Sequence, residues 1–384
     1  MKKLFYIGII GITLFEFFKV YFIMPFPGSQ AINSLDFAYF LHTYRWFIRI
    51  AFLLMLAAGA RHAFAVKRMW VPGLFTILAL VVGYYFNFKM TADSIFKEPG
   101  QLVFKSATDN ILGDSSVVVG VSINGQTKAY PVRYIVYHHQ VQDEVGGKPV
   151  LITYCSVCRT GRVFEPMVKG KPEKFRLVGM DHFNAMFEDA TTKSWWRQVN
   201  GEAVTGLLKG EVLPEVESFQ LTIAKLFELY PDAQVMQPDL AALTGLKYDT
   251  LGKYEYGKGK SALTRTDSLS WQEKSWVVGV EVEGASKAYD WNLLKAERVL
   301  HDKIRSTALV IALAADEQSF SVFKRADTAQ FTLRNDTLFV GSYAYNFSGR
   351  ALNGGESLLR LNAYQEFWHS WRTFHPDTER FGEK

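Results

Sequence analysis

The sequence predicts an α+β protein, rich in β structure, with three N-terminal transmembrane helices followed by two tandem homologous β-rich subdomains. Three observations lead to this prediction: a strongly apolar N-terminal region, a segment that recurs later in the chain, and short alternating runs bounded by turn signals. The expected domains are residues 1–92 for the membrane region, 93–240 for the first repeat and 241–384 for the second, degenerate repeat.

Three apolar runs near the N-terminus, about residues 4–26, 46–66 and 70–88, are each long enough to cross about 30 Å of hydrocarbon. Basic residues flank the first run and the turn between the other two: Lys2, Lys3, Arg61, Lys67 and Arg68. Because cytoplasmic loops are enriched in Lys and Arg, both groups are expected on the cytoplasmic side. The chain is therefore expected in the inner (cytoplasmic) membrane, in contact with lipid, with its C-terminal part extracytoplasmic.

Charged residues lie inside these apolar runs. Glu16 and Lys19 are three residues apart and can share one face of a helix, and Arg49 enters the second run from the same side. Such residues can mark contact with a quinone or with a periplasmic partner protein. Alternatively, Lys19 and Arg49 snorkel to the interface and Glu16 pairs with Lys19.

A long segment of the chain repeats at an offset of 159 residues. Residues 118–130 return as 277–289, with expected hairpin turns at Asn124-Gly125 and Glu283-Gly284. So many matched positions at one register indicate an internal duplication. An amphipathic stretch is expected to close each copy as a helix, over residues 221–230 and 363–374.

Cys155 and Cys158 are the only two cysteines, and they form a Cys-x-x-Cys motif between two β-rich runs. The motif is therefore expected in a hairpin turn. It permits three chemistries: a soft-metal site, which we favour, a thiol–disulfide oxidoreductase, or a structural disulfide in a non-catalytic binding module. The second copy carries Ala314 and Glu317 at the equivalent positions, so the first copy is expected to be the working one.

His138 is the best third member of this site, as a metal ligand or as an acid/base for a thiol. It is expected on a strand that pairs with the strand leading to Cys155, with His139 facing the other way. Further ligands follow in the chain: Met180, Asp181, His182 and Met186. The expected metal set is Cys155, Cys158, His138 and His182, which suits Cu or Zn. Trp196 and Gln198 are expected to line a pocket near the cysteines and to contact a cofactor.

Several function classes are disfavoured. The net charge is only +5 and the basic residues form no stripe, so nucleic-acid binding is not expected. The chain shows no Ser-His-Asp order, phosphate loop or His-Glu-x-x-His helix, which gives hydrolase and nucleotide-dependent functions low weight. Whether the protein is an enzyme stays open.

Residues 115–240 resemble a family of prokaryotic proteins labelled domain of unknown function 3179. The resemblance rests on these motifs: Ala129-Tyr130-Pro131, His138, Gly146-Gly147-Lys148-Pro149, Thr153-Tyr154-Cys155-Ser156-Val157-Cys158-Arg159, Ser194-Trp195-Trp196-Arg197-Gln198 and Gly201 to Gly206. The stretch Phe367-Trp368 to Thr378 resembles the end of many members. The family usually has Pro and Gly where this chain has Ser156 and Arg159, and Glu in place of His139. The resemblance implies homology, and it assigns no established activity to the chain.

Overall fold

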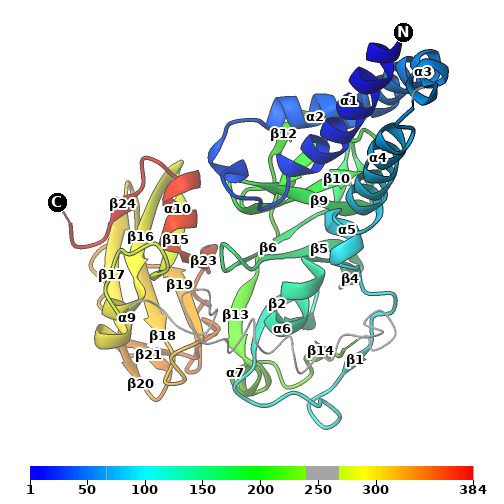
Figure 1. The fold of residues 1–384 in the computed structure, drawn as a ribbon. Coiled ribbons are helices and arrows are strands. Elements are labelled where there is room, and N and C mark those ends of the chain that lie inside the picture. Colours follow the sequence, from blue (N-terminus) through cyan, green and yellow to red (C-terminus); the bar gives the residue numbers. More distant parts are fainter. Residues whose placement is uncertain (66, 239–267, 384) are drawn as a thin grey trace. The chain divides into compact units, whose positions relative to one another are not determined.

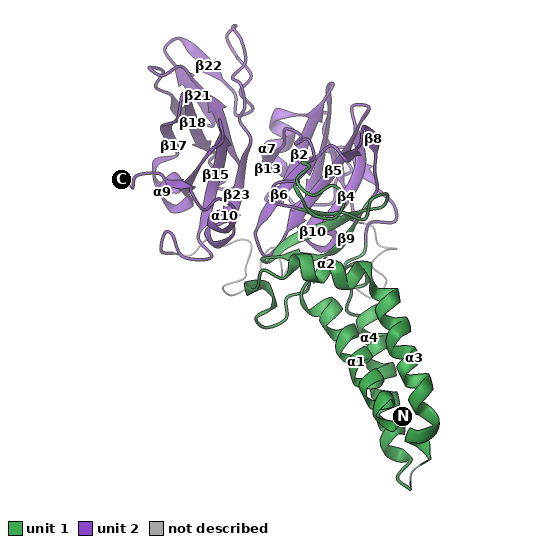
Figure 2. Ribbon diagram, turned by 90° about the horizontal axis from the view of Figure 1, so that it is seen from above, with its two compact units in different colours: residues 1–97, 175–197, 202–212 green, residues 98–174, 198–201, 213–384 purple. Residues whose placement is uncertain are grey.

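The computed structural model describes residues 1–65, 67–238 and 268–383. The expected boundary between residues 240 and 241 lies outside these residues. By their contacts, the described residues form two compact units, coloured separately in Figure 2. The first unit contains residues 1–97, 175–197 and 202–212, and the second contains the described residues of 98–174, 198–201 and 213–384.

Three helices of the first unit are long and apolar enough to cross a membrane: α1 (Lys2–Tyr21), α3 (Arg45–Phe64) and α4 (Trp70–Phe88). They confirm the three predicted apolar helices to within a few residues, except that α1 ends five residues early, ahead of Pro25 and Pro27, which cannot continue a helix. A helix of about 20 residues spans about 30 Å and satisfies its own backbone hydrogen bonds, as a bilayer requires.

Helix α1 is the buried member of this bundle, and glycines let its neighbour approach closely. A Cβ added at Gly59 of α3 would lie 2.3 Å from the backbone nitrogen of Phe5, and one at Gly8 would lie 2.9 Å from the carbonyl oxygen of Phe52. Small residues at such crossings allow the backbones of packed membrane helices to come together.

The rest of the first unit is a four-stranded antiparallel sheet, in the order β12-β11-β10-β9, with α2 (Leu35–Thr43). Figure 2 shows α2 at the end of the helical bundle opposite the N-terminus. Ile23 and Ala38 share an apolar cluster with strand residues Val178, Met186 and Trp195. The remaining bounds are η1 (Ser29–Ala31), α5 (Ala92–Ile95), β9 (Phe175–Asp181), β10 (Asn184–Asp189), β11 (Trp195–Arg197) and β12 (Ala203–Thr205).

Gly179 of β9 is expected to be intolerant of any side chain. Its added Cβ would lie 2.3 Å from the carbonyl oxygen of Ile23, which accepts a hydrogen bond from the backbone N–H of Met180 at 2.8 Å. Gly179→Ala should therefore force β9 away from the backbone of Ile23 and destabilise the first unit by about 1–3 kcal/mol. Thermal unfolding of the full chain in detergent measures the effect. Gly113→Ala, at a position with open space, is the control, and equal melting temperatures for the two variants would refute the expectation.

The first half of the second unit contains a five-stranded sheet in the order β1-β14-β3-β2-β13 and a three-stranded antiparallel sheet, β4-β5-β6 (Figure 1). β14 is parallel to β3, and the other neighbours in the larger sheet are antiparallel. The bounds are β1 (Phe104–Lys105), β2 (Val117–Ile123), β3 (Gln126–Pro131), α6 (Val132–His138), β4 (Gln140–Val145), β5 (Lys148–Cys155), β6 (Thr160–Phe164), β7 (Met167–Val168), β8 (Lys171–Pro172), β13 (Phe219–Thr222), α7 (Ile223–Leu229) and β14 (Gln234–Met236).

The second half has sheets in the orders β23-β15-β16-β24, β17-β18-β19 and β20-β21-β22. β15 begins 159 residues after β2, and β16, α9, β17 and β18 follow β3, α6, β4 and β5 at the same offset. The bounds are β15 (Trp276–Val282), β16 (Ala285–Asp290), α9 (Trp291–Glu297), β17 (Val299–Ile304), β18 (Thr307–Leu313), β19 (Phe320–Lys324), β20 (Thr332–Arg334), β21 (Thr337–Val340), β22 (Tyr343–Tyr345), β23 (Ala363–Phe367), α10 (Trp368–Phe374) and β24 (Glu379–Arg380).

Both predicted hairpin turns form. Asn124 and Gly125 have φ of 50° and 82°, and Glu283 and Gly284 have φ of 53° and 68°. Positive φ at both central residues matches the turn type that suits the twist of a two-residue hairpin. The two expected closing helices are shorter than predicted, because the first residues of each stretch belong to β13 and β23 instead.

The same polar contact secures each hairpin. In the first half, the Tyr130 hydroxyl donates to Asp143 at 2.7 Å, and Lys128 lies 2.9 Å from the same carboxylate. In the second half, the Tyr289 hydroxyl donates to Asp302 at 2.8 Å. Lys287 likewise pairs with Asp302 at 2.9 Å. One apolar cluster of the second unit includes buried residues of both halves.

Candidate thiol site

The cysteines lie at the hairpin that joins β5 to β6, as predicted. Cys155 is the last residue of β5 and pairs across the ladder with Thr160. Arg159 closes the turn with φ of 58°, a left-handed conformation that glycine adopts more readily. The turn therefore brings the side chains of Cys155 and Cys158 close to each other.

The two thiols are close together and buried. Their Sγ atoms are 3.0 Å apart, within hydrogen-bond distance, and the two cysteines are 2% and 0% exposed. No disulfide joins them. A disulfide bond is about 2.05 Å long, so about 1 Å of approach separates this pair from a bridge.

Residues of the second half surround this turn, far away in the sequence. The backbone N–H of Phe367 donates to the carbonyl oxygen of Cys158 at 2.9 Å. Lys274 Nζ donates to the carbonyl oxygen of Val157 at 3.3 Å, and His369 Nε2 lies 3.1 Å from that oxygen. The thiol site is thus completed by the junction of β23 with α10 and by Lys274, which precedes β15.

Burial raises the pKa of the Cys158 thiol well above its usual value, and the Cys155 thiol and the charge of Glu366 raise it further. The nearby Ser370 side chain lowers it in part. Burial also lowers the pKa of the Lys274 ammonium, although the charges of the cysteines partly offset this. At neutral pH the Cys158 thiol is therefore protonated, beside a lysine whose proton is held less tightly than usual.

Two buried arginines follow the cysteines. The Arg159 guanidinium lies 3.6 Å from the centre of the Trp276 ring, and burial lowers its pKa to about 10. Arg162 Nη2 donates to Glu366 Oε2 at 3.3 Å. Each arginine therefore links the cysteine hairpin to the second half.

His138 does not lie on the expected strand. Residues 132–138 form helix α6, which follows Pro131 and buries six of its seven residues. The neighbouring His139 ends this helix with φ of 59°, and its Nδ1 lies 2.9 Å from the carbonyl oxygen of Tyr154. Burial lowers the pKa of His139 to about 4, so its ring is neutral at pH 7.

The predicted metal ligands are not gathered into one cluster. In the described part of the chain, no three His, Cys, Asp or Glu side chains are grouped so that they could hold a metal ion. His182 belongs to the first unit, where its Nδ1 lies 2.7 Å from Asp181 and its Nε2 lies 3.0 Å from Asn33. Met180 and Met186 also lie in that unit, on β9 and β10.

The two predicted cofactor-contacting residues fall in different units. Gln198 belongs to the second unit and contacts the cysteine hairpin, since its Nε2 donates to Thr153 Oγ1 at 3.1 Å and to the Thr160 carbonyl at 3.2 Å. Trp196 belongs to the first unit, where its Nε1 donates to Asp189 at 2.9 Å. Gln198 is therefore placed to support the turn that carries the thiols.

Sequence reasoning missed the residues that the second half contributes around the thiols: Lys274, Glu366, His369 and Ser370. One signal was present, because the stretch that begins at Phe367-Trp368 matched the family pattern although its copy has no cysteines. These residues are more than 110 positions from the motif, so spacing alone could not associate them with it.

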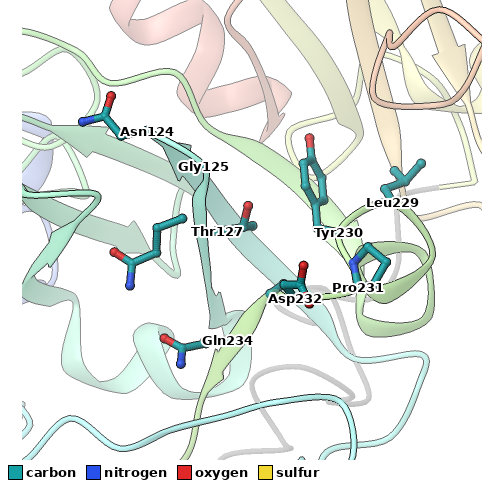
Figure 3. A pocket seen from close by; sticks show the side chains of 10 residues that line it. Asn124, Gly125, Thr127, Leu229, Tyr230, Pro231, Asp232 and Gln234 are labelled. Carbon is teal, nitrogen blue, oxygen red and sulfur yellow. The ribbon is translucent and has the colours of Figure 1, made fainter.

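A separate hollow of about 580 Å³ lies beside the β2–β3 turn (Figure 3). The hairpin residues Asn124 to Thr127 form one side, and residues 229–234, which connect α7 to β14, form the other. Asp232 supplies the single carboxylate of its lining. The cysteine pair therefore remains the part of the second unit with the clearest chemistry.

Three apolar helices and a β-rich region with a buried cysteine pair define a class of protein: a candidate membrane-anchored protein with a thiol site. The chain belongs to the family described as Protein of unknown function (DUF3179), which matches residues 99–378. This match covers both halves of the second unit, including the residues around the thiols. No curated protein and no solved structure matches the chain.

Proposed function

We propose that this chain is a membrane-anchored, extracytoplasmic thiol–disulfide protein in which Cys155 and Cys158 alternate between a dithiol and a disulfide. The observation that carries the proposal is the 3.0 Å separation of two buried sulfurs across a tight turn, with no disulfide between them. In the oxidising step, an incoming disulfide loses its S–S bond and leaves as two thiols. Cys155 and Cys158 together give up two electrons and two protons as their own S–S bond forms.

The roles of the two thiols follow from their surroundings. Cys155 is the more exposed, although only by 2% against 0%, and acts as the nucleophile. Cys158, whose pKa is raised, keeps its proton until it resolves the mixed disulfide. The positive charge of Lys274 favours the thiolate form of Cys155, as a cation beside a thiol does in general.

The proposed location follows from the basic residues near the helices. Lys2 and Lys3 precede α1, and Arg61, Lys67 and Arg68 flank the connection between α3 and α4. With these residues in the cytoplasm, three crossings place the chain beyond α4 outside it. Disulfides form and persist in such extracytoplasmic compartments, which suits a pair that changes oxidation state.

Binding of Cu or Zn by the same thiols is the second candidate, favoured by two soft sulfur ligands in one turn. The fit to tetrahedral zinc is incomplete, because the described side chains supply no group of three ligands. Zn–S bonds of about 2.3 Å at tetrahedral angles would also separate the sulfurs by about 3.8 Å. The observed 3.0 Å is nearer to a disulfide-forming pair.

We also propose that the two halves of the second unit arose by duplication, and that the second half now supports the site of the first. The shared offset of 159 residues and the equivalent hairpin contacts support this proposal. The second half has Ala314 and Glu317 at the cysteine positions. It instead contributes Lys274 and Glu366 to the surroundings of the thiols.

A redox titration with metal analysis tests the proposed function. The full chain, purified in detergent without chelator, is equilibrated in thiol–disulfide buffers of known potential, and its free thiols are counted. We expect the count to change from two to none at a midpoint between about −270 and −120 mV, the range of thiol–disulfide catalysts. Cys155→Ser and Cys158→Ser should each retain one thiol that does not convert to an intramolecular disulfide.

The other outcomes of the titration are equally definite. A midpoint below about −300 mV identifies a structural disulfide and rejects the redox proposal. One equivalent of Cu or Zn per chain, with both thiols protected until the metal is removed, selects the metal-site alternative instead.

A further inference from the structure

A small pocket of about 140 Å³ lies within the first unit, where the three apolar helices end. Lys19 and Asn87 line it from the last turns of α1 and α4. Arg45 and Arg49 line it from the first two turns of α3, and Arg176 lines it from β9. Its polar lining is therefore dominated by basic side chains.

These cations are only partly neutralised. Among the described residues, no Asp or Glu lines the pocket. Lys19 and Arg49 share one carboxylate, Glu16, whose oxygens lie 2.9 and 2.6 Å from their nitrogens. Two cations on one anion leave a positive charge at the helix ends.

The remaining two arginines differ from each other. Arg176 pairs with Glu188 at 2.8 Å and with Asp93 at 3.0 Å, so its charge is compensated. Arg45 Nη1 donates to the carbonyl oxygen of His42 at 2.6 Å, and among the described residues no carboxylate lies within 4.0 Å of its guanidinium. Arg45 is therefore the cation of the pocket lining whose charge no described carboxylate neutralises.

His42 also lines the pocket and responds to this positive field. Burial, together with the charges of Arg45, Arg176 and Lys19, lowers its pKa to about 3. The imidazole is therefore neutral at pH 7, a hydrogen-bonding group that adds no charge of its own.

Exposed aromatic side chains surround the same ends of α3 and α4, as in the aromatic belts of membrane proteins. They are Tyr44, Trp46, Phe47, Tyr84, Tyr85 and Phe88, each at least 47% exposed. Such residues lie at the level of the lipid headgroups. The pocket is then at the depth where phosphate groups of phospholipids are found.

We propose that this pocket binds the phosphate group of an anionic phospholipid headgroup, with Arg45 as its principal charge partner. An arginine can present two parallel N–H groups to a phosphate, and Lys19 and Asn87 supply further polar contacts. A volume of about 140 Å³ admits one phosphate group and few accompanying waters, since a liquid water occupies about 30 Å³. The acyl chains would stay in the bilayer beside α3 and α4.

The test measures binding by the full chain in detergent. Short-chain phosphatidylglycerol, short-chain phosphatidylcholine and inorganic phosphate are titrated separately, and the melting temperature is recorded at each concentration. We expect phosphatidylglycerol to raise the melting temperature and the other two probes to have little effect. Arg45→Gln should weaken apparent binding of phosphatidylglycerol about fivefold, as expected for one basic residue at an anionic lipid surface.

Two controls make the result specific. Arg45→Lys retains the charge and should retain most of the shift, whereas Arg61→Gln, at the opposite end of α3, should leave it unchanged. The melting temperatures without lipid show whether each variant folds. An equal shift with inorganic phosphate would overturn the lipid assignment. An equal shift with phosphatidylcholine, or an undiminished shift in Arg45→Gln, would overturn the anionic site.

Discussion

Replacing Glu16 with alanine is expected to lower the free energy of unfolding of the helical bundle by about 3–5 kcal/mol, the typical cost of removing one partner of a buried ion pair. Glu16 is 5% exposed and joins all three apolar helices. It accepts hydrogen bonds from Lys19 on α1, from Arg49 on α3 at 2.6 Å and from Asn87 on α4 at 2.8 Å. Without it, Lys19 and Arg49 would face each other with no shared carboxylate between them.

Thermal unfolding of the full chain in detergent or lipid measures this loss. Asp36→Ala is a matched control, because it also removes a carboxylate of the first unit from an ion pair, with Lys209 at 3.1 Å. That pair is exposed, with 74% of the Asp36 side chain accessible, so its removal should cost at most about 1 kcal/mol. If Glu16→Ala melts at the same temperature as the control, the charge network does not hold the helices together.

Glu366→Gln is expected to have two effects, because this fully buried carboxylate pairs with Arg162 and its charge also acts on the Cys158 thiol. Arg162 would lose its partner at 3.3 Å and keep only Glu215 at 3.7 Å, which should destabilise the second unit by about 3–5 kcal/mol. The pKa of the Cys158 thiol should also fall toward its ordinary value, since the Glu366 charge is one of the causes that raise it.

The sign of the pH dependence follows from linkage. A thiol whose pKa is raised by folding contributes stability that is present below about pH 8.5 and is lost as the pH rises toward the folded-state pKa. The contribution of Cys158 to the free energy of unfolding should therefore decline in alkaline solution. The decline should be smaller in Glu366→Gln, because the folded-state pKa of Cys158 is closer to its ordinary value in that variant.

Ultraviolet absorbance of the thiolate against pH measures this pKa, in a Cys155→Ser background that leaves a single thiol. Glu215→Gln is the matched control, since Glu215 also pairs with Arg162 but is not among the groups that raise the pKa of Cys158. We expect the control to titrate like the Cys155→Ser parent and the Glu366 variant to titrate at lower pH. Identical curves for both variants would contradict the assigned effect of Glu366.

Local sequence features predicted the elements that depend on local physics. The apolar runs predicted α1, α3 and α4, because a bilayer-length run of Leu, Ile and Phe has few other stable conformations in lipid. Asn124-Gly125 predicted a hairpin because both residues accept positive φ. The cysteine turn between β5 and β6 followed from the β-rich runs on each side.

Features that depend on distant contacts were not predictable in this way. The segment that contains His138 is rich in β-branched and aromatic residues and was expected to be a strand. It forms a short helix instead, and six of its seven residues are buried, so an apolar run of this length could not distinguish a strand from a buried helix. The residues around the thiols, such as Lys274 and Glu366, come from the other half of the unit. Only tertiary packing determines which residues meet there.

The first unit is assembled from separate stretches of the chain, and this has a consequence for biosynthesis. The apolar helices emerge from the ribosome first, but β9 to β12 are made only after the cysteine hairpin. The apolar cluster of Ile23 and Ala38 can therefore form only after Val178 and Trp195 have been synthesised. A fragment that starts at residue 98 would carry the apolar face of β9 to β12 without this covering. Cutting the chain after α4 therefore does not separate a complete soluble part from the membrane anchor.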